Sequence, residues 1–539
     1  MPSAKQIPEP RVDPQAAIEQ LVHWLLSASI SCVAGLAIGL MAARLMRSKH
    51  LHWSWAALGL TPVALAPSAL AGGVWTLTVA VLSATVCGRR WHREDLDAGA
   101  DLAELAAARQ GPLQVLQSLV RRAALRRLDS AGADGWFRGG ELILGRDERC
   151  RAVSVPFGGR SGGRHTLVVG ASGSGKTITQ TWMAVRAIGR GMGVIVVDPK
   201  GDDGMRAEVR RAAQAAHAPF VEWTPEGHSV YNPYSRGGET EIADKTLAGE
   251  RFTEPHYLRQ AQRYLGHVVR ALRNSGAEVS LQGIVDHLDP SRLELLARSL
   301  PEREAQATHA YLDSLTARQQ SDLAGVRDRL AILAESDVGP WLDPDTPGAE
   351  RFDLLEAVRA RAVVYFDLES DRRPLLAQML GAAVVQDLQT TVAALQGRPV
   401  PTLVVIDEFS AVAAEQVVRL FGRARSAGFS LLLGTQELAD LRPPGRERLL
   451  EQVMGNLSVL IAHRQVVPAS AELVASVAGT TGAWRISRRS DGATTRTRTR
   501  APALEPNQVL SLGQGWSAVI VTGGGGARIA HMFSPARAH

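Results

Sequence analysis

The strongest chemical signal in the sequence is a glycine-rich segment that ends in a lysine and a threonine. Residues 164–177 read RHTLVVGASGSGKT, and Gly170, Gly175, Lys176 and Thr177 match the pattern G-x-x-x-x-G-K-[ST]. Glycines in such a loop let successive backbone N–H groups converge on phosphate oxygens. The lysine reaches the β- and γ-phosphates and the threonine hydroxyl ligates Mg²⁺. We therefore predict a site for ATP with Mg²⁺.

A short strand and a helix must position this loop. Thr166–Val169 is an apolar run that predicts a strand, and the helix expected over about 177–188 brings the positive end of its dipole to the phosphates. The predicted nucleotide-binding residues are Gly170, Ala171, Ser172, Gly173, Ser174, Gly175, Lys176, Thr177 and Ile178.

A pair of carboxylates forms the second half of this chemistry. Residues 402–410 read TLVVIDEFS, and Leu403–Ile406 is typical of a buried parallel strand. Asp407, at the end of that strand, is predicted to bind Mg²⁺ directly or through water. Glu408 is predicted to act as the general base for the attacking water. The alternative is an acidic strand end that caps a helix.

Two further polar residues are candidates for sensing or completing the site. The apolar run Ser430–Gly434 predicts an additional strand that ends near Gln436, which is a candidate sensor of the γ-phosphate. Such an added strand is characteristic of additional-strand NTPases. Arg425 precedes it and is a candidate arginine finger for a neighbouring subunit, with Arg423 as a competitor. The alternative for both arginines is a solvated turn.

Lysine is rare in this chain, so each lysine within a motif carries information. Only five of the 60 basic residues are lysines. Lys200 follows the predicted strand Val194–Val197 in the segment DPKGD, at the strand end where α/β sheets bind ligands. The alternative is a solvated turn.

A third cationic feature lies near the C-terminus. Arg496, Arg498 and Arg500 alternate with threonines, so a strand would present all three on one face. We predict a basic hairpin that contacts a DNA backbone without reading its sequence. The alternative is an exposed hairpin that has no ligand.

Composition excludes several classes of protein. Hydrophobic residues make up 45% and charged residues 21% of the 539 residues, which excludes a disordered or fibrous chain. Three cysteines exclude a disulfide-stabilised secreted protein. The formal net charge of +6 permits a polyanionic partner without requiring one.

The N-terminal part reads as a membrane anchor. Residues 21–43 contain no charged residue and, at about 1.5 Å per residue, would span about 34 Å as a helix. A second uncharged stretch, 51–88, is interrupted by Pro62, Pro67 and Gly72-Gly73, so it predicts either a second span or a re-entrant hairpin. The basic residues after both stretches do not define one orientation.

These patterns predict the domain organisation and the fold class. We expect a membrane anchor over 1–90, with spans at about 21–43 and within 55–87, and linker or stalk helices over 91–135. An α/β P-loop NTPase domain of the additional-strand (RecA-like) type should comprise 136–236 and 346–539. Helical periodicity over 237–345 predicts an inserted all-α subdomain.

Taken in order, these motifs resemble the coupling proteins of type IV secretion and conjugation (TraD/TraG-like) within the FtsK/HerA-like translocase ATPases. The resemblance rests on the anchor, RHTLVVGASGSGKT, VVDPKGD, YNPYS, LVVIDEFS, GRARSAGFSLLLGTQE and LEPNQVLSLGQGWSAVIVTGG. It implies Walker A roles for Lys176 and Thr177, Walker B roles for Asp407 and Glu408, a sensor role for Gln436 and a finger role for Arg425.

The resemblance also implies partners and a location. The family forms homo-hexamers that span the bacterial inner membrane more than once, with the ATPase domain in the cytoplasm. It delivers relaxase-bound DNA into the type IV secretion channel and binds that DNA without sequence specificity. Alternatives are a coupling ATPase for protein effectors, an FtsK-like DNA translocase and a substrate receptor that does not hydrolyse ATP.

Overall fold

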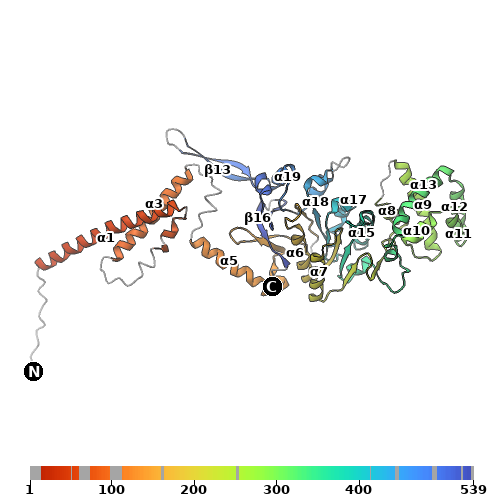
Figure 1. Ribbon diagram of the computed structural model, residues 1–539, viewed down its shortest axis with the longest axis horizontal. Helices are drawn as coiled ribbons and strands as arrows, with labels where there is room; N and C mark the ends of the chain where they lie inside the picture. The colour runs from red at the N-terminus through yellow and green to blue at the C-terminus, as the bar shows by residue number, and fades with distance from the viewer. Residues whose placement is uncertain are drawn as a thin grey trace, which may run out of the picture. The chain divides into compact units, whose positions relative to one another are not determined.

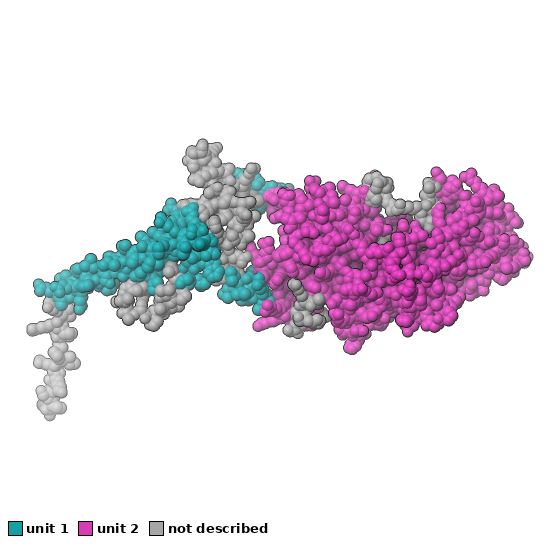
Figure 2. Space-filling model, viewed as in Figure 1, with its two compact units in different colours: residues 1–124, 482–500 teal, residues 125–481, 501–539 magenta. Residues whose placement is uncertain are grey.

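The chain divides into two compact units, coloured separately in Figure 2. One unit comprises residues 1–124 with 482–500, and the other comprises 125–481 with 501–539. The computed structural model describes residues 14–49, 51–56, 58–59, 73–97, 112–130, 132–158, 163–249, 254–412, 414–442, 448–488, 494–523 and 526–535.

The first unit contains a long apolar helix, α1 (Pro14–Ser48), packed against α3 (Gly73–Asp97). Gly35 and Gly39 of α1 allow this close approach, because a Cβ on either would collide with the Thr76 carbonyl or the Ser83 side chain of α3. Among the described helices, α1 alone has the length and hydropathy of a membrane span.

The expectation of two spans is therefore supported only for the first. Helix α3 begins inside the second predicted stretch but continues into a charged segment that contains Arg89 and Arg90. Residues 57 and 60–72 of that stretch lie outside the described residues. Helix α5 (Pro112–Ser130) lies within the predicted linker.

The second unit is built on a mixed sheet, to which twelve strands of the described residues belong (Figure 1). Seven neighbouring strands run parallel, in the order β12-β4-β11-β10-β5-β9-β6, and β15, β16 and β2 extend the sheet antiparallel from β12. The strands are β1 (Phe137–Arg138), β2 (Glu141–Arg146), β3 (Ala152–Pro156), β4 (Thr166–Val169), β5 (Gly193–Asp198), β6 (Phe220–Trp223), β9 (Val363–Asp367), β10 (Thr402–Ile406), β11 (Phe429–Thr435), β12 (Val459–Ala462), β15 (Trp516–Val521) and β16 (Gly526–Met532).

The central strands are buried on both faces, as their continuous apolar runs predict. In β10, Val404 and Ile406 join one hydrophobic core, whereas Leu403 and Val405 join the other. Helices α6 (Lys176–Gly189) and α7 (Asp203–Ala215) cover the second face, and α15 (Pro374–Ala394) and α17 (Ala414–Ala424) cover the first. Strand β11 lies between β4 and β10, which confirms the predicted additional-strand topology.

The first hydrophobic core extends beyond the sheet into a group of helices. Between residues 237 and 345 the described residues contain helices and no strand, and these helices gather at one side of the unit (Figure 1). Asp289 accepts a hydrogen bond from the Ser291 N–H (2.8 Å) and Pro290 occupies the first turn of α11, as the sequence indicated. The helices are α8 (Glu239–Thr246), α9 (Pro255–Asn274), α10 (Leu281–His287), α11 (Pro290–Ala297), α12 (Glu302–Asp313) and α13 (Ala317–Ala334).

Short elements complete the second unit. Strands β7 (Ser229–Tyr231) and β8 (Glu350–Phe352) pair in parallel where the chain leaves and re-enters the sheet domain. The remaining described α-helices are α14 (Leu354–Arg359), α16 (Phe409–Val412), α18 (Leu449–Asn456), α19 (Pro468–Ala478) and α20 (Pro506–Leu510). Strands β13 (Thr480–Arg488) and β14 (Thr494–Pro502), which lie mostly within residues 482–500 of the first unit, pair with each other.

Candidate nucleotide site

The glycine-rich loop joins β4 to α6 at the carboxyl edge of the parallel sheet. Gly173 and Gly175 have positive φ angles of 74° and 112°, a conformation that favours glycine. Gly175 is the N-cap of α6, so Lys176 lies in the first turn of the helix. The N-terminal N–H groups of α6 have no partner within the helix, and they are suited to an anion such as phosphate.

Three other segments hold the loop from outside. The Gly170 N–H donates to the Thr435 carbonyl (3.3 Å), and the Ala171 N–H donates to the Arg464 carbonyl (3.1 Å). The Ser174 carbonyl accepts from the Gly515 N–H (3.0 Å). The loop is therefore tied to the ends of β11 and β12 and to the turn before β15.

The predicted lysine and the predicted carboxylates meet across this edge. The Lys176 Nζ lies 2.9 Å from Asp407 Oδ1 and 2.7 Å from Glu408 Oε1, although more than 230 residues separate them. All three side chains are about nine-tenths buried. A hydrogen-bonded ion pair satisfies buried charges that would otherwise be costly.

The electrostatics of this cluster favour the charged form of both partners. Burial opposes charge on Lys176, but the carboxylates Asp407 and Glu408 raise its pKa above the ordinary value. Burial likewise opposes charge on Glu408, but Lys176, Lys200 and the Gln436 amide lower its pKa. Glu408 is therefore a carboxylate at neutral pH, which is the state a general base requires.

Glu408 is held in an unusual backbone conformation. Its φ of 44° lies in the left-handed region, which non-glycine residues rarely adopt. Its Oε1 accepts hydrogen bonds from Lys176, from Lys200 Nζ (3.1 Å) and from Gln436 Nε2 (3.1 Å). These three donors direct the carboxylate into the site.

Gln436 and Lys200 both reach the site; the sequence had indicated Gln436 as a candidate sensor and Lys200 with a solvated turn as the alternative. Lys200 is positioned by Asp198, whose carboxylate accepts from the backbone N–H groups of residues 200–202 and from the Tyr365 hydroxyl (2.6 Å). The Asp198 carboxylate therefore stabilises the turn that carries Lys200.

One residue of the site escaped the sequence reading. Gln180, one turn beyond Lys176 in α6, donates from Nε2 to Asp407 Oδ1 (3.2 Å). The i, i+4 spacing from Lys176 is the signal that would have found it, because these positions share a face of the helix.

The residues present fit Mg²⁺ in the manner typical of P-loop sites. Thr177 and Asp407 offer two oxygen ligands, and phosphate and water oxygens supply the rest in such sites. Clusters of three or more histidine, cysteine or carboxylate side chains suited to a metal are absent from the described residues.

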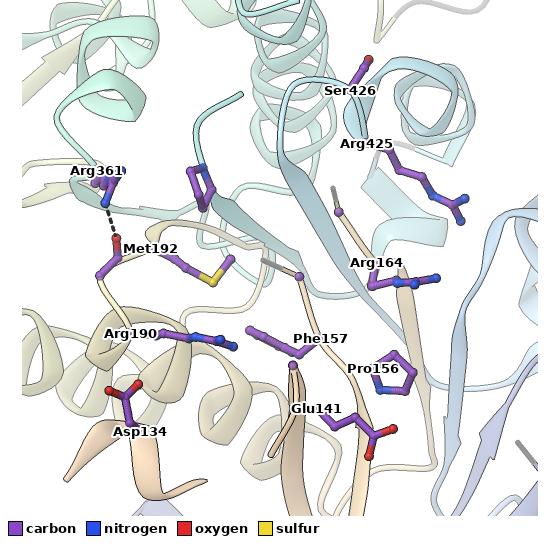
Figure 3. A pocket seen from close by; sticks show the side chains of 16 residues that line it. Asp134, Glu141, Pro156, Phe157, Arg164, Arg190, Met192, Arg361, Arg425 and Ser426 are labelled. Carbon is purple, nitrogen blue, oxygen red and sulfur yellow. Dashed lines mark hydrogen bonds between the residues drawn. The ribbon is translucent and has the colours of Figure 1, made fainter. Parts of the chain in front are cut away.

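Arg425, the predicted finger, lies far from this cluster within its own chain. It follows α17 and lines a cavity of about 1210 Å³ at the amino edge of the sheet, together with Arg164, Arg190 and Arg361 (Figure 3). Each of these arginines lies in the connection that leads into a parallel strand. Arg425 also donates to the Asn456 carbonyl (3.3 Å). Arg423 is exposed and does not line this cavity.

The predicted basic hairpin corresponds to β13 and β14. Arg498 and Arg500 are exposed on β14, and the Arg498 guanidinium lies over Gly482 of β13. Arg496 belongs to β14, and its side chain lies outside the described residues. Contact with DNA stays a prediction.

Comparisons with known proteins identify a matching family and a relative of this chain. Residues 401–514 match the family described as the TraM recognition site of TraD and TraG. A protein of Mycoplasma pneumoniae (strain ATCC 29342 / M129 / Subtype 1), named only as an uncharacterized protein, is 31% identical over 104 residues, which are 19% of this chain and 69% of that protein. At this identity and coverage the two chains belong to one family.

Solved structures share the fold. The bacterial conjugative coupling protein TrwBdeltaN70, in its unbound monoclinic form, has a TM-score of 0.53 at 16% identity and covers 75% of this chain and 91% of its own. The plasmid coupling protein TrwB in complex with ADP and Mg²⁺ has a TM-score of 0.52 at 17% identity, over 69% and 86%. VirB4 of Thermoanaerobacter pseudethanolicus has a TM-score of 0.51 at 14% identity, over 74% and 97%. The second unit therefore has the RecA-like NTPase fold.

Proposed function

We propose that this chain, a TraD/TraG-like type IV coupling protein, is a membrane-anchored ATPase that drives relaxase-bound DNA into a secretion channel. The observation that carries the proposal is the Lys176 ammonium held 2.9 Å and 2.7 Å from Asp407 and Glu408 beside a P-loop. The family match and the RecA-like fold support the motor role, and the apolar helix α1 supports an anchor in the bacterial inner membrane.

The chain's own residues divide the chemistry between them. Lys176 and the loop N–H groups would hold the phosphates of ATP, and Thr177 and Asp407 would hold Mg²⁺, which neutralises phosphate charge when bound. Glu408 would accept a proton from the attacking water, with Gln436 orienting the same carboxylate (3.1 Å). TrwB has been solved with ADP and Mg²⁺, which supports this assignment of ligands.

A ring of identical subunits would complete the site. Arg425 lies at the amino edge, so it would serve the nucleotide of a neighbouring copy and not its own. A homo-hexamer with its ATPase domain in the cytoplasm is the assembly that we propose. The family matched by residues 401–514 is described by recognition of TraM, which supports a protein partner from the DNA-processing complex.

The decisive experiment measures DNA-stimulated ATP hydrolysis by the full-length protein in detergent. Lys176→Ala should reduce hydrolysis at least about 100-fold, because it removes the cation that contacts the β- and γ-phosphates. Arg298→Ala, which removes an exposed cation of the helical subdomain, should leave hydrolysis unchanged. Full activity of Lys176→Ala would overturn the proposed function.

The same preparation tests the DNA contact. Replacing Arg496, Arg498 and Arg500 by alanine should weaken DNA binding equally for all sequences. It should also reduce the steepness of the plot of log binding constant against log salt concentration by about two to three. An unchanged salt slope would show that the hairpin does not contact DNA. Hydrolysis that responds to protein effectors and not to DNA would favour an effector-coupling ATPase.

A further inference from the structure

A buried histidine lies directly behind the phosphate loop. His463 follows β12, and its N–H donates to the Val169 carbonyl (2.8 Å) at the last residue before the loop. Its side chain is fully buried. The imidazole Nε2 lies 2.9 Å from the Thr179 Oγ1, within the first turn of α6. His463 therefore contacts both sides of the loop, through its backbone N–H before the loop and through its imidazole after it.

The loop is shaped around this imidazole. A Cβ on Gly170 would come within 2.6 Å of the His463 Cβ, and a Cβ on Gly175 would come within 3.4 Å of the His463 Cε1. The glycines at both ends of the loop thus pack against the ring. A smaller side chain at 463 would leave a gap behind the loop, and interior gaps are costly because packing contacts are lost.

The ring is neutral under physiological conditions. Burial, with a smaller contribution from Lys176, lowers the pKa of His463 to about 4, against hydrogen bonds that oppose the change. A neutral ring adds no charge to compete with Lys176 for phosphate. Its contribution to the site is therefore one of geometry.

We propose that His463 is the positioning residue of the phosphate loop, which it fixes against α6 through the Thr179 hydroxyl. The inference rests on the proposed nucleotide site and adds a residue that its motifs do not include. His463 would fix the distance between the glycines of the loop and the first turn of α6. This would keep Lys176 and Thr177 in position to contact the phosphates. Its loss would weaken nucleotide binding in protein that is fully folded.

The chain offers a matched control in His165. It too is buried, and burial together with Arg425 lowers its pKa to about 3. It lies before β4, at the opposite end of that strand, where Nδ1 accepts from the Leu431 N–H (3.2 Å) and the ring packs on Phe421. His165 should therefore contribute to stability without touching the loop.

The test compares ADP affinity in the presence of Mg²⁺ with thermal stability measured without nucleotide, in the full-length protein. We expect His463→Leu to raise the Kd for ADP about fivefold, the effect of one lost hydrogen bond in the site. His463→Gln, whose amide nitrogen can replace Nε2, should stay within about twofold of the original Kd. His165→Leu should lower the melting temperature and leave the Kd unchanged.

A double substitution tests whether His463 acts through Thr179. Thr179→Val replaces the hydroxyl by a methyl group, so it should raise the Kd for ADP about as much as His463→Leu does. The double variant should bind ADP no more weakly than either single variant. Additive losses, or equal losses in His165→Leu, would overturn the positioning role. Normal ADP binding by Lys176→Ala would show that the proposed nucleotide site is wrong. If Lys176→Ala loses ADP binding while His463→Leu and Thr179→Val keep it, the nucleotide site stands and only the inference about His463 fails.

Discussion

The two edges of the central parallel sheet carry opposite electrostatic arrangements. At the carboxyl edge, the Lys176 ammonium lies between Asp407 and Glu408, and each charge has a partner of opposite sign. At the amino edge, Arg164, Arg190, Arg361 and Arg425 line one cavity, and none of them pairs with a carboxylate of the described residues. The charges of one edge are paired with each other, whereas the four arginines of the other edge line a cavity with Asp134 and Glu141 and make no ion pair with the described carboxylates.

This difference follows from how a parallel sheet orders its connections. Loops after the strands meet at one edge and loops before them meet at the other, so the phosphate loop and the finger candidate cannot act on one nucleotide within one chain. A head-to-tail assembly brings the amino edge of one copy to the carboxyl edge of the next. The comparison therefore predicts that catalysis is divided between subunits.

The largest expected effect comes from the amino edge. Arg425→Ala should reduce ATP hydrolysis about 10³-fold with little change in nucleotide affinity, because a finger acts on the transition state. Arg423→Ala, two residues earlier and exposed, is the control and should hydrolyse normally. Mixing Arg425→Ala subunits with inactive Lys176→Ala subunits should restore part of the activity, since some interfaces then carry both intact halves. No recovery in assembled mixtures would argue against a shared site.

A smaller loss is expected at the carboxyl edge. Glu408→Gln removes the proposed general base, so hydrolysis should fall about 10²-fold while ATP stays bound. Lys176 keeps its contact with Asp407 in this variant (2.9 Å), and the loop should hold its shape. The matched control is Glu451→Gln, an exposed carboxylate paired with Arg442. Rapid hydrolysis by Glu408→Gln would assign the proton transfer to another group.

The smallest expected effect compares the two buried histidines, one at each edge. The pKa of His165 is lowered to about 3 and that of His463 to about 4, from an ordinary 6.5, mainly by burial. Below pH 6.5 the unfolded chain binds protons that the folded chain does not, so stability is lost as the pH falls from about 6.5 towards 4. At pH 5 each histidine should cost about 2 kcal/mol relative to pH 7.

Urea unfolding of the full-length protein at pH 7 and pH 5 checks this expectation. His165→Gln and His463→Gln should each lose less stability on acidification than the original chain, because glutamine does not titrate. An equal loss in all three proteins would show that neither histidine is responsible.

Much of the nucleotide site could be read from local sequence. Lys176 and Thr177 are contained in one motif, and Asp407 and Glu408 follow an apolar run whose length and burial match β10. These features are local because a phosphate loop needs a particular order of glycines, and a strand buried on both faces needs consecutive apolar residues. The order of motifs along the chain was enough to indicate the family.

Other features required the folded chain. Gln180 lies within a helix and belongs to no motif of its own. From the sequence, Lys200 could also have lain in a solvated turn. His463 reads from sequence as the end of an ordinary strand, and its contact with Thr179 joins residues 284 positions apart. Such contacts depend on the order of strands in the sheet, which local patterns do not encode.

The amino-acid sequence by itself determined the chemistry of this protein: a phosphate loop, an acidic strand end and an apolar N-terminal helix, each written in contiguous residues. Only the tertiary structure decided which edge of the sheet each charged side chain occupies. The physical reason is that strand pairing, with β11 inserted between β4 and β10, brings Lys176 to Asp407 and carries Arg425 to the opposite edge.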